Sequence, residues 1–67
     1  MINQVKLGRV KNNMTQSDLA EKVNVSRQTI YAIEQGNYNL SIVLALKIAS
    51  VFDTSIHDLF ELEANDW

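Results

Sequence analysis

The segment TQSDLAEKVNVSRQTIYAIEQG, residues 15–36, contains two short helical patterns that only three residues separate. Each pattern opens on a hydroxyl residue, Thr15 or Ser26, whose oxygen can accept a hydrogen bond from an unpaired amide of the first helical turn. Asn24 lies in the middle of the three-residue connection. Asparagine tolerates the left-handed backbone conformation that a sharp reversal requires better than most residues do. The segment therefore predicts two helices joined by a tight turn.

The two predicted helices, residues 15–22 and 26–35, carry apolar residues at spacings that let them face each other. These residues are Leu19, Ala20, Val23, Val25, Ile30 and Ile33. Ala20 is small enough for the second helix to cross the first at close range. Two helices arranged in this way form a helix-turn-helix, in which the second helix can enter the major groove of DNA.

The same segment resembles the DNA-binding domains of phage repressor and Cro proteins and of the bacterial regulators related to them. The matching residues are Thr15-Gln16, Leu19-Ala20, Val25-Ser26, Ile30, Ile33-Glu34 and Gly36. The later segment LALKIASVFDTSIHDLF resembles the fourth and fifth helices of that family. The resemblance runs from about Val5 to Phe60 and implies an all-α, five-helix, lambda-repressor-like domain. Short stand-alone members such as the cytolysin repressor, which carry a C-terminal strand, are the most similar to it.

The composition is compatible with one small helical domain. The chain has 67 residues, no proline and no cysteine, so it forms no disulfide and offers no thiol nucleophile and no zinc finger. Absence of cysteine favours a reducing compartment. No apolar run reaches the length of about 18 residues needed to span a membrane, and no signal peptide is recognisable. We therefore expect a cytoplasmic protein without a membrane partner.

The net charge of −2 is unevenly distributed. Residues 1–47 hold all six basic residues and three acids, whereas residues 48–67 hold five acids and no base. Local potential rather than total charge steers a polyanion to a surface. We expect the acidic C-terminal part to face away from DNA. Because there are few bases, few phosphate contacts and a modest dependence on salt are expected.

The pattern before residue 15 predicts a first helix over residues 3–11, with Val5 and Val10 directed inward. Gly8 is unusual there, because the family has a large aliphatic residue at the equivalent position, and glycine weakens a helix by about 0.5–1 kcal/mol relative to alanine. We expect Leu7 to turn inward and fill the space.

Two further helices are predicted over residues 41–52 and 55–60. In the first of them, the inward residues expected from a three-four spacing are Ile42, Ala45, Leu46, Ala49 and either Val51 or Phe52. Ser55 and Asp58 form a third capping pattern. Residues 61–67 form a tail, in which the alternation of polar and apolar residues from 61 to 64 is compatible with a short strand.

The amino end of the helix predicted over residues 26–35 carries the candidate base contacts. Arg27 can donate two hydrogen bonds to guanine, and Gln28 can pair bidentately with adenine. Thr29 and Tyr31 are further candidates on the exposed side. A solvated helix face is the alternative for Arg27 and Gln28, and the resemblance favours contact with the groove.

Four residues are candidate contacts to the DNA backbone: Gln16, Ser26, Asn37 and Asn39. The resemblance implies that Gln16 binds a phosphate and braces the first polar side chain of the recognition helix. It also places the loop of Asn37 and Asn39 beside the sugar-phosphate backbone. Without the resemblance, Gln16 is an exposed residue at a helix start and the asparagines belong to an ordinary loop.

The resemblance also implies that Arg9 and Glu34 form a partly buried, structural ion pair. The single histidine, His57, has no cysteine or second histidine near it in the sequence and reads as a surface residue. No combination of nucleophile, base and orienting group is recognisable. We therefore expect no enzyme, no metal site, no cofactor and no small-molecule ligand.

Apolar residues near the C-terminus suggest a homodimer interface. The candidates are Ile56, Phe60, Leu62 and Trp67, with Leu59 and either Ile56 or Phe60 expected in the core. Leu62 and Trp67 follow the five predicted helices, and a monomer offers little to cover them. A frayed tail is the alternative for Trp67. The resemblance suggests that residues 61–64 form a strand that pairs across the dimer axis.

These observations predict a regulator of transcription of bacterial or phage type that binds double-stranded DNA. The resemblance implies a repressor that acts as a homodimer on an inverted-repeat operator, because one recognition helix reads too few base pairs for specificity in a genome. Two alternatives stay open: an antitoxin-like partner, and a helix-turn-helix fold that serves as a protein-interaction module. The acidic isoelectric point favours the latter.

Overall fold

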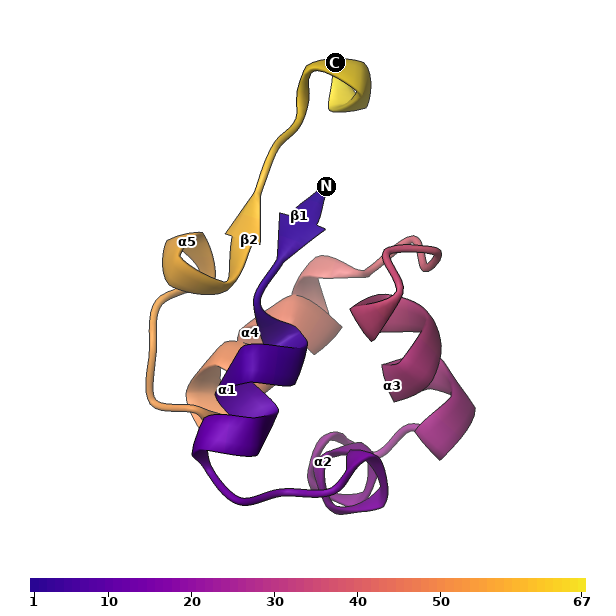
Figure 1. Ribbon diagram of the computed structural model, residues 1–67, viewed down its shortest axis with the longest axis vertical. Helices are drawn as coiled ribbons and strands as arrows, with labels where there is room; N and C mark the ends of the chain where they lie inside the picture. Colours follow the sequence, from indigo (N-terminus) through magenta and orange to yellow (C-terminus); the bar gives the residue numbers. More distant parts are fainter.

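The computed structural model describes residues 1–67 and contains the five expected helices (Figure 1). In chain order, the elements are β1 (Ile2–Asn3), α1 (Val5–Lys11), α2 (Gln16–Val23), α3 (Arg27–Glu34), α4 (Ile42–Val51), α5 (Ile56–Leu59) and β2 (Phe60–Glu61), followed by the 3₁₀ turn η1 (Ala64–Asp66). The five-helix fold is thus confirmed. No helix of the chain is long and apolar enough to cross a membrane.

Hydroxyl residues define the starts of four helices. Thr15, Ser26, Ser41 and Ser55 have extended backbones, and each side chain accepts a hydrogen bond from the amide three residues further on. These bonds use one of the amides that lack a partner in the first turn of a helix. The helix starts are therefore encoded locally in the sequence.

The ends of α1 to α4 share a second local device. Each is followed by a residue with positive φ: Asn13 (58°), Asn24 (61°), Gly36 (78°) and Asp53 (54°). After α3, the Gly36 amide donates to the Ile33 carbonyl and the Asn37 amide donates to the Ala32 carbonyl, each over 3.0 Å. This pair of bonds closes the last turn of the helix and reverses the chain. The expected left-handed Asn24 and Gly36 are both confirmed.

The core lies where α1, α2, α3, α4 and α5 meet. Its largest fully buried side chains are Leu19, Ile30, Ile48, Val5 and Val23. Of the apolar set expected between α2 and α3, five residues are buried and Val25 is half-buried against the core. Leu59 is buried, and the half-buried Phe60 packs against the core. The helix-turn-helix is therefore one packed unit.

The prediction for α4 was partly wrong. Ala45, Ala49 and Phe52 are buried as expected, but Ile42 and Leu46 are 65% and 52% exposed. Leu44 and Ile48 take the inward places instead. Almost every position of α4 is apolar, so periodicity in the sequence could not distinguish its two faces. One consequence is an apolar helix face that the monomer leaves uncovered.

The packing expected around Gly8 was also wrong. Leu7 is 64% exposed, and Val10 is exposed as well. A Cβ atom placed on Gly8 would lie 2.7 Å from Cδ2 of the buried Phe52, so the aromatic ring occupies the space that a side chain at position 8 would need. Gly8 therefore allows α1 to approach Phe52 closely.

Replacing Gly8 by alanine is expected to lower the free energy of unfolding by about 1–2 kcal/mol. Alanine favours a helix by about 0.5–1 kcal/mol, but overpacking against a core ring costs about 1–3 kcal/mol. Urea denaturation followed by circular dichroism measures the difference. In a Phe52→Leu background the same substitution should be neutral or stabilising. Stabilisation in the wild-type background would contradict the packing described for Phe52.

The two ends of the chain lie side by side in an antiparallel pair of strands (Figure 1). Ile2 pairs with Glu61 and Asn3 pairs with Phe60. Two expectations were therefore wrong: α1 begins at Val5 rather than at residue 3, and the C-terminal strand covers Phe60–Glu61 rather than residues 61–64. Its observed partner is β1 of the same chain rather than a strand of a second copy.

Candidate nucleic-acid interface

The amino end of α3 presents an exposed face. Arg27, Gln28 and Tyr31 are exposed, whereas Ile30 and Ile33 are buried. Residues three and four apart lie above one another on a helix, so Tyr31 shares a face with Arg27 and Gln28. Packing of the opposite face on α2 fixes the direction of this exposed face.

Ser26 and Thr29 hold the start of α3. The Ser26 hydroxyl oxygen accepts a hydrogen bond from the Thr29 amide at 3.2 Å, and the two hydroxyl groups are 3.0 Å apart. Thr29 is half-buried and Ser26 is exposed. The hydroxyl of Thr29 is thus engaged within the protein, which leaves its methyl group as the part available for an outside contact.

Gln16, the first residue of α2, has a different partner from the one that the resemblance implied. Its Nε2 donates a hydrogen bond to Oε1 of Glu34 at 3.2 Å. Glu34 is the last residue of α3, whereas the braced side chain was expected near the beginning of that helix. The side chain of Gln16 is half-buried.

Arg9 and Glu34 form an ion pair between α1 and α3. The Arg9 Nε donates to Glu34 Oε2 at 2.7 Å, and Nη2 donates to Oε1 at 3.3 Å. Only 1% of the Glu34 side chain is exposed, and these hydrogen bonds to Glu34 raise the pKa of Arg9 above its ordinary value. Neither side chain is free to serve as an independent surface charge.

A capping box fixes the start of α2. The Asp18 amide donates to Thr15 Oγ1 at 3.0 Å, and the Thr15 amide donates to Asp18 Oδ2 at 2.9 Å. The hydrogen bond from the Thr15 amide, with that from its hydroxyl, lowers the pKa of Asp18 below the ordinary 3.8. Asp18 is two positions from Gln16 and therefore on the other side of the helix.

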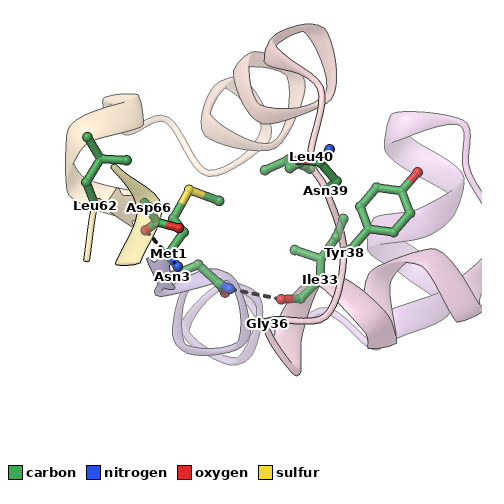
Figure 2. A pocket seen from close by; sticks show the side chains of 9 residues that line it. All are labelled: Met1, Asn3, Ile33, Gly36, Tyr38, Asn39, Leu40, Leu62 and Asp66. Carbon is green, nitrogen blue, oxygen red and sulfur yellow. Dashed lines mark hydrogen bonds and ion pairs between the residues drawn. The ribbon is translucent and has the colours of Figure 1, made fainter. Parts of the chain in front are cut away.

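The loop after α3 carries Asn37, Tyr38 and Asn39, all exposed. It borders an open pocket of about 310 Å³ that also includes Asn3 and Leu62 (Figure 2). The Asn3 side-chain amide donates to the Ile33 carbonyl at 2.9 Å, and its Oδ1 accepts from the amide of Val5. Asn3 therefore joins the start of α1 to the end of α3. Nothing in the local sequence signalled this contact.

The acidic C-terminal segment lies at one end of the long axis of the molecule. In Figure 1 it is at the top, and α2 and the start of α3 are at the bottom. This arrangement agrees with the expectation that the acids lie away from the exposed end of α3. His57 is exposed, and no group of three or more His, Cys, Asp or Glu side chains is placed to hold a metal ion.

The chain is similar to known regulators over nearly its whole length. It is 50% identical over 66 residues to an HTH-type transcriptional regulator of Methanocaldococcus jannaschii, which covers 98% of this chain and 100% of that protein. It is 46% identical over 63 residues to YgzD of Bacillus subtilis, also an HTH-type transcriptional regulator, with coverage of 94% and 96%. Relatives thus occur in archaea as well as in bacteria.

Solved structures show the same fold. The restriction-modification controller protein C.AhdI of Aeromonas hydrophila superposes with a TM-score of 0.79 at 28% identity, covering 85% of this chain and 86% of that one. SinR of Bacillus subtilis, in its complex with DNA, superposes with a TM-score of 0.75 at 36% identity, covering 85% and 94%. The profile of the helix-turn-helix family matches residues 5–59. The chain therefore belongs to the helix-turn-helix family of DNA-binding transcriptional regulators, in its Cro/C1 type.

Proposed function

We propose that this protein is a repressor that binds an inverted-repeat operator as a homodimer. The observation that carries the proposal is the exposed face at the amino end of α3, which the packing of α2 holds outward. Arg27 and Gln28 are the residue types that read guanine and adenine in the major groove. Tyr31 and the methyl group of Thr29 lie beside them. A protein bound there works where the operator DNA is, in the cytoplasm of a prokaryotic cell.

Backbone contacts would come from both sides of this face. Gln16 and Ser26 stand at the starts of α2 and α3, where free amides and the helix dipole favour an anion. Asn37 and Asn39 follow the end of α3 and have exposed side chains. Such contacts would set the register of the protein on DNA, while Arg27 and Gln28 would supply sequence preference.

Selection of bound duplexes from a random DNA pool tests this function most directly. We expect an inverted repeat whose half-site centres lie about 34 Å apart, one turn of the duplex. A single half-site, or no preferred sequence at moderate salt, would contradict the proposal. A reporter gene with the selected operator placed over its promoter then tests repression: expression should fall when the protein is present and recover when the operator is scrambled.

The dimer surface that we propose is an apolar patch on α4 and the C-terminal segment. The patch consists of Ile42, Val43 and Leu46 on α4, followed by Ile56, Phe60 and Leu62. The three α4 residues are between 52% and 65% exposed, and a shared hollow of about 390 Å³ joins Ile42 to Ile56, Phe60 and Leu62. Exposed apolar surfaces of this kind mark interaction sites.

Two properties favour a second copy of the chain as the partner. A two-fold axis brings a patch against itself, so a base and an acid on one rim can pair with their counterparts. Lys47 follows Leu46, and Glu61 precedes Leu62. The domain measures 32 × 22 × 19 Å, so two copies side by side place equivalent points at a spacing comparable to one DNA turn. Trp67, 93% exposed, is a peripheral candidate.

Replacing Leu46 by aspartate is expected to convert the dimer to a monomer with little change in stability. The side chain is mostly exposed, and exposed substitutions usually change the free energy of unfolding by less than about 0.5 kcal/mol. Sedimentation velocity measures the state of association. The matched control is Leu7→Asp, because Leu7 is an exposed leucine on α1, outside the patch. A wild-type monomer, or equal effects of the two variants, would contradict the assigned surface.

A further inference from the structure

A buried hydrogen-bond network joins three helices directly behind one of the candidate phosphate contacts. Glu34 at the end of α3 accepts hydrogen bonds from Arg9 of α1 and from Gln16 of α2. Arg9 also donates from Nη1 to the carbonyl of Met14 at 2.9 Å. Met14 immediately precedes the capping residue Thr15. Arg9 and Glu34 thus fix both the entry to α2 and the side chain of its first residue.

The bond to Glu34 restricts a side chain that would otherwise be mobile. A glutamine amide carries two N–H donors, and Glu34 Oε1 accepts one of them, at 3.2 Å. The second N–H is left for a partner outside the protein. An unrestrained glutamine loses rotamer freedom when it binds a ligand, and a glutamine that is already held loses less. The amide of Gln16 is therefore ordered before any phosphate arrives.

The charge of Glu34 would by itself oppose a phosphate near Gln16. Its carboxylate is almost completely buried, where screening by water and salt is weak. Arg9 places a guanidinium on the same carboxylate through two hydrogen bonds. The pair is neutral as a unit, so the negative charge behind Gln16 is cancelled without placing an additional cation on the surface.

We propose that Glu34 and Arg9 are positioning residues for DNA binding: Glu34 orients the Gln16 amide toward a backbone phosphate, and Arg9 neutralises the carboxylate that does so. This inference rests on the proposed DNA-binding function. It assigns to the ion pair a role in affinity in addition to its role in stability. The two roles predict different results when substitutions at positions 16 and 34 are combined.

A double-mutant cycle with Gln16→Ala and Glu34→Asp separates the two roles. Aspartate keeps the charge, and the flexible Arg9 can follow it, but the shorter side chain withdraws from Gln16. Each single variant should bind the selected operator about five-fold more weakly per half-site, the effect of one hydrogen bond. In the Gln16→Ala background, Glu34→Asp should cause no further loss. Independent, multiplying losses would overturn the inference.

Two additional measurements make the result independent of folding. Ile33→Val, a conservative change in the core beside Glu34, should lower thermal stability without changing operator affinity when all variants are fully folded by circular dichroism. If Glu34→Asp does not fold, Arg9→Lys replaces it, since lysine keeps the charge but loses the two-pronged contact. A loss of affinity in Arg9→Lys that persists unchanged in the Gln16→Ala background would overturn the inference.

The phosphate itself is probed with operators in which single phosphates are replaced by neutral methylphosphonates. One position should weaken binding of the wild type but have little effect on Gln16→Ala or Glu34→Asp. Sensitivity at that position which is equal in all three proteins would overturn the positioning role while leaving the proposed function intact. Absence of any preferred duplex for the wild type would instead overturn the proposed function, and the inference with it.

Discussion

Replacing Arg27 by alanine is expected to lower operator affinity by about 5- to 150-fold for each half-site, which corresponds to the 1–3 kcal/mol that one bidentate contact with a base contributes. Gln28→Ala should have an effect of the same order, at a different base pair. In a dimer both half-sites are affected, so the total loss is approximately the square of these factors. Titration of labelled duplexes followed by fluorescence anisotropy measures it.

The selectivity of the loss identifies a base contact. Affinity for non-operator DNA should fall much less in Arg27→Ala than affinity for the operator, because base contacts carry the sequence information. Lys11→Ala is the control, since it removes the same charge from the far end of α1. Arg27→Lys should recover only part of the affinity, because lysine keeps the charge without the planar fork. Equal losses on every duplex would show that Arg27 binds phosphate only.

Replacing Arg9 by methionine is expected to lower the free energy of unfolding by about 3–5 kcal/mol, since it leaves a buried charge without its partner. Glu34 would retain only the hydrogen bond from Gln16. A domain of this size has a total stability of about 3–10 kcal/mol, so the variant should be largely unfolded at moderate temperature. Urea denaturation at pH 7 provides the measurement.

A second substitution tests the cause. If the buried charge is responsible, Arg9→Met combined with Glu34→Leu should recover most of the lost stability, because two apolar side chains of suitable size can replace a buried ion pair. The same double variant should lack the contribution of Gln16 to DNA binding. Failure of the double variant to recover stability would show that the contact from Arg9 to the Met14 carbonyl matters more than the charge.

Much of the fold was predictable because its signals are local. The hydroxyl caps at Thr15 and Ser26 act over three residues, and Asn24 and Gly36 reverse the chain within one helical turn. Amphipathic spacing placed Leu19 and its neighbours correctly in the core. These features depend on residues close together in the sequence, so they can be read without knowledge of the tertiary structure.

The errors concern contacts between distant residues. Asn3 belongs to a strand of two residues whose partner begins at Phe60, so no local pattern marks it. Gly8 looked unfavourable because Phe52, which needs the space, lies on another helix. The hydrogen bond of Gln16 to Glu34 likewise joins residues 18 positions apart. In the candidate site, the sequence identified the side chains, and the tertiary structure revealed which of them hold others in place.

The pairing of β1 with β2 makes the two extremities of the chain a single fastening. It closes a loop of almost the entire polypeptide with two residues on each side, which is an entropically weak closure. Amide hydrogens there should exchange with solvent earlier than those of the helices. Since Asn3 of β1 also holds the Ile33 carbonyl, opening of the fastening loosens the last turn of α3. Bulky fusions at either extremity should therefore be felt at the DNA-reading helix, although they are attached at the opposite end of the molecule.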